Sequence, residues 1–473
     1  MNSAEWTEAF RAATVDVAQM DVGTVSYEES ARRLRTLLKT KLLLHTDLRD
    51  SPERFFLAHR ILATYATKLG PGFWIRFTVH YNLCVGTVLA LGTEEQIASL
   101  SDMQEHGLLG CFGLTERLAG VSSGLVVNAV ADWDEETDGF TINTLDVGAA
   151  KNWISQGLVA DKAVVVAELR VKGVSHGPHA FFMDFRRDGE VVPGIMLGDM
   201  GKKTVGNDLD NAWIMFNNVK VPKSTLLNRY ADIRNGKYVA ADSSRPVFHM
   251  IGQRLFTGRV AVAQAALEFR RTLYATTKEY TDKRQCWTPT GSRPLSSVPQ
   301  VRALFEENAK NQHLCDRFVA KCESELCRCL RENTLPSVAL TDAIAVAKVK
   351  AVEDSIKFVH LLQNEVGSFA LMKGTGFEQR DFLTCCKFAE GDTRVLMQKM
   401  ARDRVKAFQK TRAKAKAECT EETALCSELV EAMRQSSSGP EAAWDIQHEK
   451  VYRLAGVIID RTVTSFLSPQ SKL

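Results

Sequence analysis

The spacing of apolar residues changes twice along the chain, and these two changes constrain the fold more than any other feature. Up to about Gly107, apolar residues recur every three or four positions, as in "ERFFLAHRILATYATKL", which is the spacing of one helix face. From about Leu108 to Leu227 the pattern becomes short β-rich runs between turn residues. From His249 the helical spacing returns. This order predicts an α+β protein.

We expect an N-terminal helical domain, a middle antiparallel β domain, a C-terminal helical bundle, and a final helix with a tail. Their expected bounds are 1–107, 108–230, 247–434 and 435–473. The predicted strands include "GFTINTL", "KAVVVAEL", "HAFFMDF" and "NAWIMFNNVKVP". Long helical segments joined by short connections are typical of an antiparallel bundle. The last helix is expected over 443–467, after a break rich in turn residues.

Composition narrows the class of partner. The chain has 473 residues, of which 45% are hydrophobic and 25% charged, as is usual for globular proteins. Its 60 Lys and Arg nearly balance 57 Asp and Glu, so nucleic acid is not expected as a partner. No apolar run approaches the length of a membrane span. The beginning, "MNSAEWTEAFRAA", is unlike a secretory signal.

The eleven cysteines indicate reduced thiols rather than a disulfide framework, because their number is odd and no secretory signal accompanies them. Cys322, Cys327 and Cys329 cluster in a helical stretch. A zinc site needs about four converging ligands, and no second ligand pair accompanies this cluster. We therefore expect no metal.

The last three residues, Ser471, Lys472 and Leu473, spell the peroxisomal import tripeptide. They follow "LSPQ", where a receptor could reach them. They predict the peroxisomal import receptor as a partner, and a location in the peroxisome or a related organelle such as the glycosome.

One acidic residue stands where an irregular segment meets a helix. In "CKFAEGDTRVLMQKMARDR", Glu390 precedes Gly391, and Asp392 or Thr393 can cap the helix that follows. Gly391 lacks a side chain that would crowd a ligand beside it. A carboxylate at this place could be a general base or a solvated acid near a helix N-terminus. From this stretch alone the solvated acid is favoured.

Two motifs in the β region carry a resemblance to a known family. "GCFGLTERLAG" at 110–120 and "KNWISQG" at 151–157 resemble the flavin-contacting segments of the acyl-CoA dehydrogenase and acyl-CoA oxidase superfamily. The resemblance runs from roughly Ser51 to Arg404. "SPERFFLAHRIL", "HYNLCVGTVLALGTEEQ" and "GPHAFFMDF" are more similar to peroxisomal acyl-CoA oxidases than to mitochondrial dehydrogenases.

The resemblance implies FAD as the cofactor. Thr115, with the backbone N–H groups from Phe112 to Leu114, would bond the pyrimidine edge of the flavin. Trp153 would pack against the ring and Ser155 would offer a hydroxyl near N5. Taken alone, Trp153 reads more simply as a core tryptophan in a strand; the flavin interpretation rests on the joint match of Thr115, Trp153 and Ser155.

The family's catalytic base is a glutamate before a glycine at the entry to a late helix, and "AEGDTRVLMQKMARD" aligns with that segment. The resemblance therefore makes Glu390 the candidate base. It would take the α-proton of a fatty acyl-CoA while the β-hydrogen leaves as hydride, giving a trans-2-enoyl-CoA, with O2 as the electron acceptor. Burial beneath substrate would raise the pKa of Glu390 toward neutrality.

Other implied contacts lie at a subunit interface, so the resemblance predicts a homodimer. Arg284 resembles the arginine that reaches the partner's flavin pyrophosphate, with Lys283 as an alternative register. Gln363 and Gly367 fall where the family has further contacts to the partner's flavin. Arg259 is either structural or substrate-binding. Further candidates near the substrate are Ser122 and Gly391.

The sequence also departs from the family pattern. Val366 and Phe369 stand where glycines are usual, so the backbone cannot approach a pyrophosphate as closely. Val121 replaces a phosphate-facing serine, for which Ser122 or Ser123 could substitute. Two alternatives to an oxidase are kept. A length of 473 residues, nearer that of the dehydrogenases, favours an acyl-CoA dehydrogenase that uses a flavoprotein acceptor, and the lost glycines favour a non-catalytic relative that binds acyl-CoA.

Overall fold

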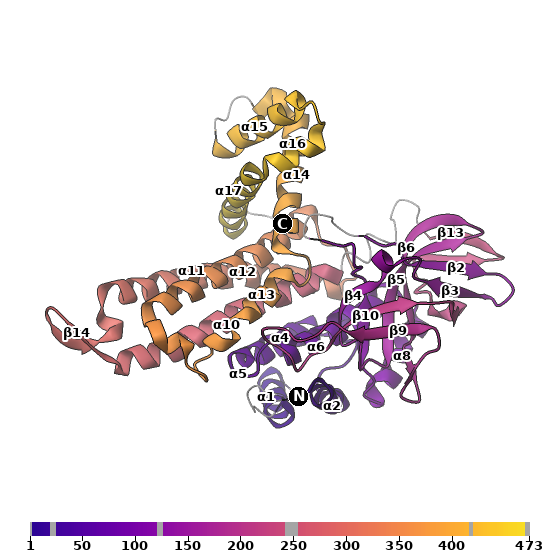
Figure 1. The fold of residues 1–473 in the computed structure, drawn as a ribbon, viewed down its shortest axis with the longest axis horizontal. Helices are drawn as coiled ribbons and strands as arrows, with labels where there is room; N and C mark the ends of the chain where they lie inside the picture. The colour runs from indigo at the N-terminus through magenta and orange to yellow at the C-terminus, as the bar shows by residue number, and fades with distance from the viewer. Residues whose placement is uncertain (1, 19–24, 121–125, 242–253, 416–419, 469–473) are drawn as a thin grey trace.

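The computed structural model describes residues 2–18, 25–120, 126–241, 254–415 and 420–468. Elements follow the order expected from the sequence, with helices first, then β-sheets, then helices (Figure 1). None of the described helices is both long and apolar enough to cross a lipid bilayer.

The N-terminal part consists of short helices, and side chains cap the start of α1, α2 and α8. Ser26 accepts a hydrogen bond from the backbone of Glu29, and Thr93 forms a capping box with Gln96. One segment, η1, is a π-helix, a form that is rare and often found at functional sites. The elements are α1 (Ser3–Ala18), α2 (Tyr27–Lys39), α3 (Asp47–Asp50), α4 (Pro52–Thr64), α5 (Ala66–Leu69), α6 (Gly72–Thr78), η1 (Val79–Val85), α7 (Gly86–Leu91) and α8 (Glu94–Glu105).

The middle part is built on a six-stranded sheet in which β5 is the central strand. β1 and β2 share one edge of β5 and run parallel to it, while β6 pairs antiparallel with the other edge. The domain is thus mixed rather than wholly antiparallel as expected. A three-stranded antiparallel sheet, β4-β10-β9, lies beside it. The strands are β1 (Gly110–Gly113), β2 (Val130–Asp134), β3 (Gly139–Asn143), β4 (Lys151–Ser155), β5 (Lys162–Val171), β6 (Val174–Asp184), β7 (Arg186–Arg187), β8 (Glu190–Val191), β9 (Ile195–Asp199), β10 (Asn211–Phe216), β11 (Val219–Pro222), β12 (Ala231–Arg234) and β13 (Lys237–Ala240).

Alternating residues of β5 join two different cores. Val164 and Val166 face the large core formed with the helices, whereas Val165 and Ala167 belong to the core inside the β part. Because side chains alternate across a strand, one strand can bind both layers. The sheet is therefore fixed against the helices that carry the candidate site.

Three long helices run side by side away from the sheets (Figure 1). Tyr280, near the end of α10, stacks on Phe369, just beyond α12, with ring centroids 3.6 Å apart. These two helices therefore end together. The elements of this part are α10 (Arg254–Lys283), β14 (Gln285–Thr288), β15 (Gly291–Pro294), α11 (Pro299–Arg331), α12 (Val338–Val366), α13 (Asp381–Phe388) and α14 (Thr393–Ala415).

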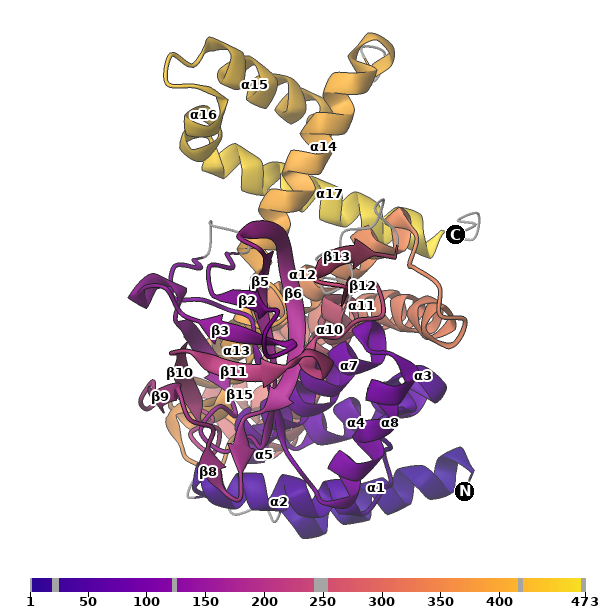
Figure 2. The same ribbon diagram turned by 90° about the vertical axis from the view of Figure 1, so that its right-hand side faces the viewer.

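The last helices form a lobe that stands at the end of α14 (Figure 2). It has a core of its own, which includes Phe408 and Leu429. The helix expected over 443–467 is divided, because Gln447 leaves the helical conformation at ψ 21°. The lobe contains α15 (Glu421–Gln435), α16 (Pro440–Ile446) and α17 (His448–Leu467).

Candidate active site

Glu390 lies in the short turn between α13, which ends at Phe388, and α14, which begins at Thr393. Its φ is 57° and that of Gly391 is 95°, so both residues have left-handed backbone. For a residue other than glycine this conformation costs about 1–3 kcal/mol and persists only where the surroundings impose it. The side chain of Asp392 caps α14 by accepting a hydrogen bond from the N–H of Arg394 at 2.7 Å. The turn thus presents Glu390 outside both helices, as the sequence predicts.

The Glu390 side chain points inward and is only 8% exposed. Asn82 Nδ2 donates to Glu390 Oε1 at 3.1 Å, and Asn82 is oriented by Thr257, whose hydroxyl donates to Asn82 Oδ1 at 2.6 Å. Among the described residues, Glu390 Oε2 has no hydrogen-bond partner. One oxygen is anchored, and the other is available for a proton.

Burial raises the pKa of the Glu390 carboxyl from its ordinary value of 4.5 to about 7. The Asn82 hydrogen bond and the charges of Arg259 and Lys348 lower it in part. Arg259 also donates from Nε to the backbone oxygen of Glu390 at 3.1 Å. A carboxyl that titrates near neutrality can accept a proton from substrate and release it again.

α10 approaches the carboxyl very closely at Gly258. A Cβ placed on Gly258 would lie 2.1 Å from Glu390 Cδ, which no real structure tolerates. The absence of a side chain at this position therefore makes room for the carboxylate. Asn82, Thr257 and Gly258 were not identified from the sequence, because they come from η1 and α10, far from Glu390 along the chain.

The π-helix η1 joins Glu390 to the first motif expected to contact a flavin. His80 Nδ1 accepts from the N–H of Gly110 at 3.1 Å, and Gln156 Nε2 donates to Gly110 O at 2.8 Å. A Cβ on Gly110 would lie 2.3 Å from Cys84 Sγ. The start of β1 is therefore clamped against the same element that carries Asn82.

The two sequence motifs lie side by side. Asn152 N–H donates to Thr115 O at 2.9 Å. Thr115 is exposed, and Trp153 is 55% exposed with a φ of 58°. Ser155 Oγ accepts from Asn211 Nδ2 at 2.9 Å. Trp153 is thus not a core tryptophan: its indole and Thr115 are exposed, while Ser155 is half-buried on the same strand as Trp153.

A buried ion pair, which was not identified from the sequence, joins the two motifs. Lys151 Nζ lies 2.8 Å from Glu116 Oε1, and both side chains are fully buried. Glu116 also accepts the backbone N–H groups of Asn128 and Ala129. The other motif residues, Phe112 in β1 and Leu114 just after it, are half-buried and buried respectively.

Arg284, Gln363 and Gly367 do not join this site within the chain. Arg284 follows the end of α10, whereas Gly258 is near its start, and a helix rises 1.5 Å per residue, so about 40 Å separates them. Arg284 is exposed, and Gln363 Oε1 accepts from Arg380 Nη1 at 2.5 Å. Phe369, at a position where the resemblance predicts a glycine, packs on Tyr280.

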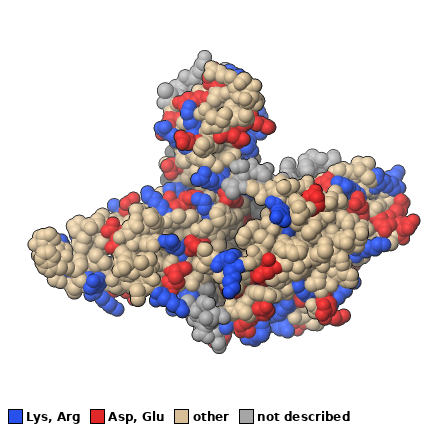
Figure 3. Space-filling model, viewed as in Figure 1, with Lys and Arg blue, Asp and Glu red and all other residues tan. Residues whose placement is uncertain are grey.

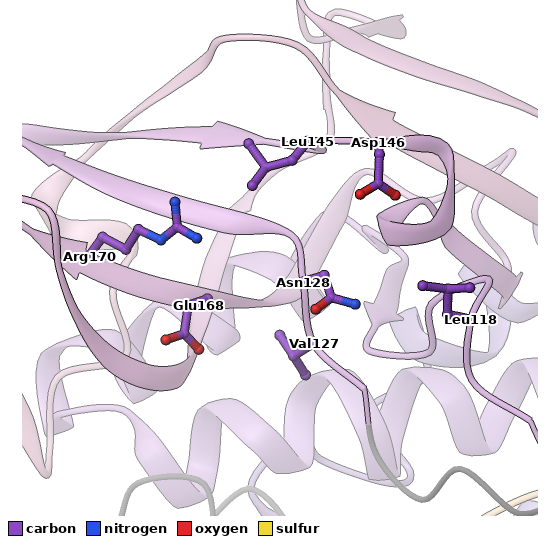
Figure 4. Close-up of a pocket in the computed structure, with 7 residues that line it drawn as sticks. All are labelled: Leu118, Val127, Asn128, Leu145, Asp146, Glu168 and Arg170. Carbon is purple, nitrogen blue, oxygen red and sulfur yellow. The ribbon is translucent and has the colours of Figure 1, made fainter.

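Some candidates lie outside the described residues: Ser122, Ser471, Lys472 and Leu473. A cavity of about 440 Å³ lies in the β part of the chain (Figure 4). Its lining carries two carboxylates against one guanidinium, which disfavours a phosphate ligand. The lining residues are Leu118, Val127, Asn128, Leu145, Asp146, Glu168 and Arg170.

Among the described residues, no three His, Cys, Asp or Glu side chains are grouped to hold a metal ion.

Comparison with known proteins places the chain among relatives. No protein-family model matches it. Acyl-coenzyme A oxidase 2 of Yarrowia lipolytica is 31% identical over 283 residues, which cover 58% of this chain and 39% of that protein. Peroxisomal acyl-coenzyme A oxidase 3 of Homo sapiens is 30% identical over 277 residues, or 57% and 39%. The chain spans about two fifths of the length of these relatives.

Solved structures share the fold. Acyl-CoA oxidase-2 of Caenorhabditis elegans, whose structure holds FAD, ascaroside-CoA and ATP, matches with a TM-score of 0.77 at 18% identity, over 99% of this chain and 77% of that one. Butyryl-CoA dehydrogenase of Megasphaera elsdenii matches with a TM-score of 0.64 at 20% identity, over 84% and 97%. The resemblance inferred from the sequence is confirmed, and so is the fold class.

Proposed function

We propose that this chain, a relative of the acyl-CoA oxidases with the fold of their superfamily, is an FAD-dependent acyl-CoA oxidase. It would convert a fatty acyl-CoA into the trans-2-enoyl-CoA and pass the electrons to O2. The observation that carries the proposal is the Glu390 carboxyl. It is buried, anchored through Oε1, unpartnered at Oε2 among the described residues, and has a pKa of about 7.

The chain's own residues supply proton transfer and positioning. Glu390 Oε2 would take the α-proton of the thioester, while Asn82 and Arg259 keep the carboxyl and its backbone in place. Thr115, Trp153 and Ser155 fit a flavin, since an exposed indole and two hydroxyl-bearing residues come from two motifs joined by the Asn152–Thr115 backbone hydrogen bond. When bound, FAD would supply the hydride acceptor for the β-hydrogen and the route of the electrons to O2.

We propose a homodimer in which Arg284, Gln363 and Gly367 serve the partner's site. Apolar side chains are exposed at the same end of α10 and α12: Trp287 is 81% exposed, Leu371 79% and Met372 62%. On the face in Figure 3 the end that carries the β14–β15 hairpin is largely uncharged, and charges of both signs are scattered elsewhere. Sedimentation at micromolar concentration tests the assembly, and a monomer with bound FAD would refute it.

A location in the peroxisome is proposed as well. Relatives are named as peroxisomal enzymes, and the tripeptide Ser471-Lys472-Leu473 is of the kind read by the import receptor. A fluorescent fusion that keeps the tripeptide at its C-terminus should enter peroxisomes. The same fusion without the tripeptide should remain outside them.

A dehydrogenase is the second candidate. The match to butyryl-CoA dehydrogenase covers 97% of that chain, against 77% for the oxidase of Caenorhabditis elegans. The two candidates differ in their acceptor. A dehydrogenase would reduce an artificial acceptor and release no hydrogen peroxide in air.

The deciding experiment measures peroxide and enoyl-CoA from purified protein supplied with FAD and a saturated acyl-CoA in air. An oxidase should form both in equal amounts. If acyl-CoA bleaches the flavin under anaerobic conditions but no peroxide forms in air, the dehydrogenase is favoured. If the protein binds no FAD and acyl-CoA bleaches no flavin, a non-catalytic relative that binds acyl-CoA is favoured.

A further inference from the structure

Lys348, in the middle of α12, is fully buried although it forms no ion pair with any described carboxylate. Its ammonium donates to two backbone oxygens, Lys387 O at 2.7 Å and Gly391 O at 2.8 Å. Removing a cation from water without a counter-ion is strongly unfavourable. A lysine at this position therefore calls for an explanation beyond packing.

The two oxygens that Lys348 binds bracket Glu390. Lys387 is in the last turn of α13, where backbone carbonyls lack helical partners and favour a cation. Gly391 follows Glu390 directly. Arg259 binds the oxygen between them, Glu390 O, from the side of α10. Two cations from two helices thus hold three carbonyls within five residues of chain.

We propose that Lys348 is a positioning residue for Glu390, which holds the left-handed Glu390–Gly391 turn so that the carboxyl stays aimed into its pocket. The contacts explain how the turn persists: α13 and the turn are both tied to α12. Lys348 does not touch Glu390's carboxyl, so it acts through the backbone. The catalytic consequence rests on the proposed function, whereas the hold on the turn does not.

The charge of Lys348 gives a second effect. Burial lowers the pKa of Lys348 to about 7, while Cys386, Asp392 and Glu353 raise it and Arg259 lowers it further. The positive charge in turn lowers the pKa of Glu390. Removing Lys348 should therefore move the titration of Glu390 to higher pH.

Amide hydrogen exchange tests the hold on the turn directly. In Lys348→Met, amides in the peptide 386–396 should exchange roughly tenfold or more faster than in the wild type, because two hydrogen bonds that close the turn are lost. The matched control is Lys321→Met, since Lys321 Nζ donates to the carbonyl of Phe466 at 2.6 Å, in another part of the bundle. That control should leave peptide 386–396 unchanged.

Unchanged exchange in peptide 386–396 of Lys348→Met would overturn the proposal, as would equal acceleration in Lys321→Met. If Lys348→Met does not fold, Lys348→Arg, which keeps charge and donors at a different length, takes its place. In Lys348→Arg the amides of peptide 386–396 should exchange faster than in the wild type and more slowly than in an unfolded peptide. The assignment would be contradicted if peptide 386–396 of Lys348→Arg exchanged as slowly as in the wild type while another part of the chain exchanged faster.

Two further readouts separate this inference from the proposed function. Infrared titration, with Glu390→Gln as the blank, should show the carboxyl titrating at higher pH in Lys348→Met, whether or not the protein is an enzyme. If the wild type reduces its flavin with acyl-CoA, Lys348→Met should do so roughly 10- to 100-fold more slowly with KM unchanged. A wild type without turnover would refute the oxidase and leave the infrared result standing.

Discussion

Gly258 lies so close to the carboxyl group of Glu390 that no side chain would fit at position 258. A Cβ on Gly258 would lie 2.4 Å from each carboxyl oxygen of Glu390. The helix backbone of α10 therefore forms one wall of the carboxyl's pocket. This contact, together with Asn82, fixes where the proposed base can stand.

Gly258→Ala should displace the Glu390 carboxyl and slow flavin reduction by acyl-CoA roughly 10- to 100-fold, since small misplacements of a base are costly. The clash is with a buried group that has little room to move. The matched control is Gly456→Ala in α17, where an added Cβ meets nothing within 4 Å. It should keep full activity and raise stability by about 0.4–1 kcal/mol. Equal rates for wild type and Gly258→Ala would contradict the role given to this contact.

Glu390→Gln should remove catalysis and stabilise the fold at high pH. The folded pKa, about 7, exceeds the ordinary value of 4.5, so the folded state holds the proton more tightly than the unfolded state. That stabilisation is complete below pH 4.5 and is lost as pH rises through 7. Above pH 7 the wild type should be up to about 3 kcal/mol less stable than Glu390→Gln, at 1.36 kcal/mol per unit of pKa. Urea unfolding at pH 5 and pH 8 measures the difference in unfolding free energy between Glu390→Gln and the wild type. If this difference is the same at both pH values, the carboxyl is not desolvated.

Asn82→Asp should shift the pH dependence of flavin reduction to higher pH by about one unit or more, because two carboxyls at hydrogen-bond distance cannot both ionise easily. The Asn82 amide nitrogen now lies 3.1 Å from Glu390 Oε1. Asn82→Ala, which removes the hydrogen bond without adding charge, should shift the profile less. Superimposable profiles for the two variants would mean that residue 82 does not face the base.

The order of elements could be predicted from the sequence because apolar spacing is local. Segments such as "KAVVVAEL" and "NAWIMFNNVKVP" indeed form β5, and β10 with β11. The parallel pairing of β1 and β2 with β5 could not be predicted, since it joins segments tens of residues apart. The break at Gln447 was missed because the apolar residues on either side of it, Trp444 and Val451, are seven positions apart, which also fits two turns of one continuous helix.

The candidate site was predicted only in part. Glu390 was predicted through the resemblance of its segment to the family's base segment, but the residues around it come from η1, α10 and α12. Two weak signals were available: Asn82 interrupts the apolar run "TVHYNLCVGTV", and Lys348 interrupts "AIAVAKVKAV". A polar residue inside an apolar helix face must find partners when buried. Which partner it finds depends on the packing of distant elements.

Lys151→Met should destabilise the β domain by about 3–5 kcal/mol, because it leaves the Glu116 carboxylate buried without its cation. Glu116 holds the backbone N–H groups of Asn128 and Ala129, so the segment after the first motif should loosen and FAD should bind more weakly. The control is Lys172→Met, which breaks the ion pair with Glu135, where both side chains are more than half exposed. It should cost less than about 1 kcal/mol. Chemical unfolding and flavin titration of both variants measure the effects; similar costs for the two would show that burial does not strengthen the Glu116–Lys151 pair.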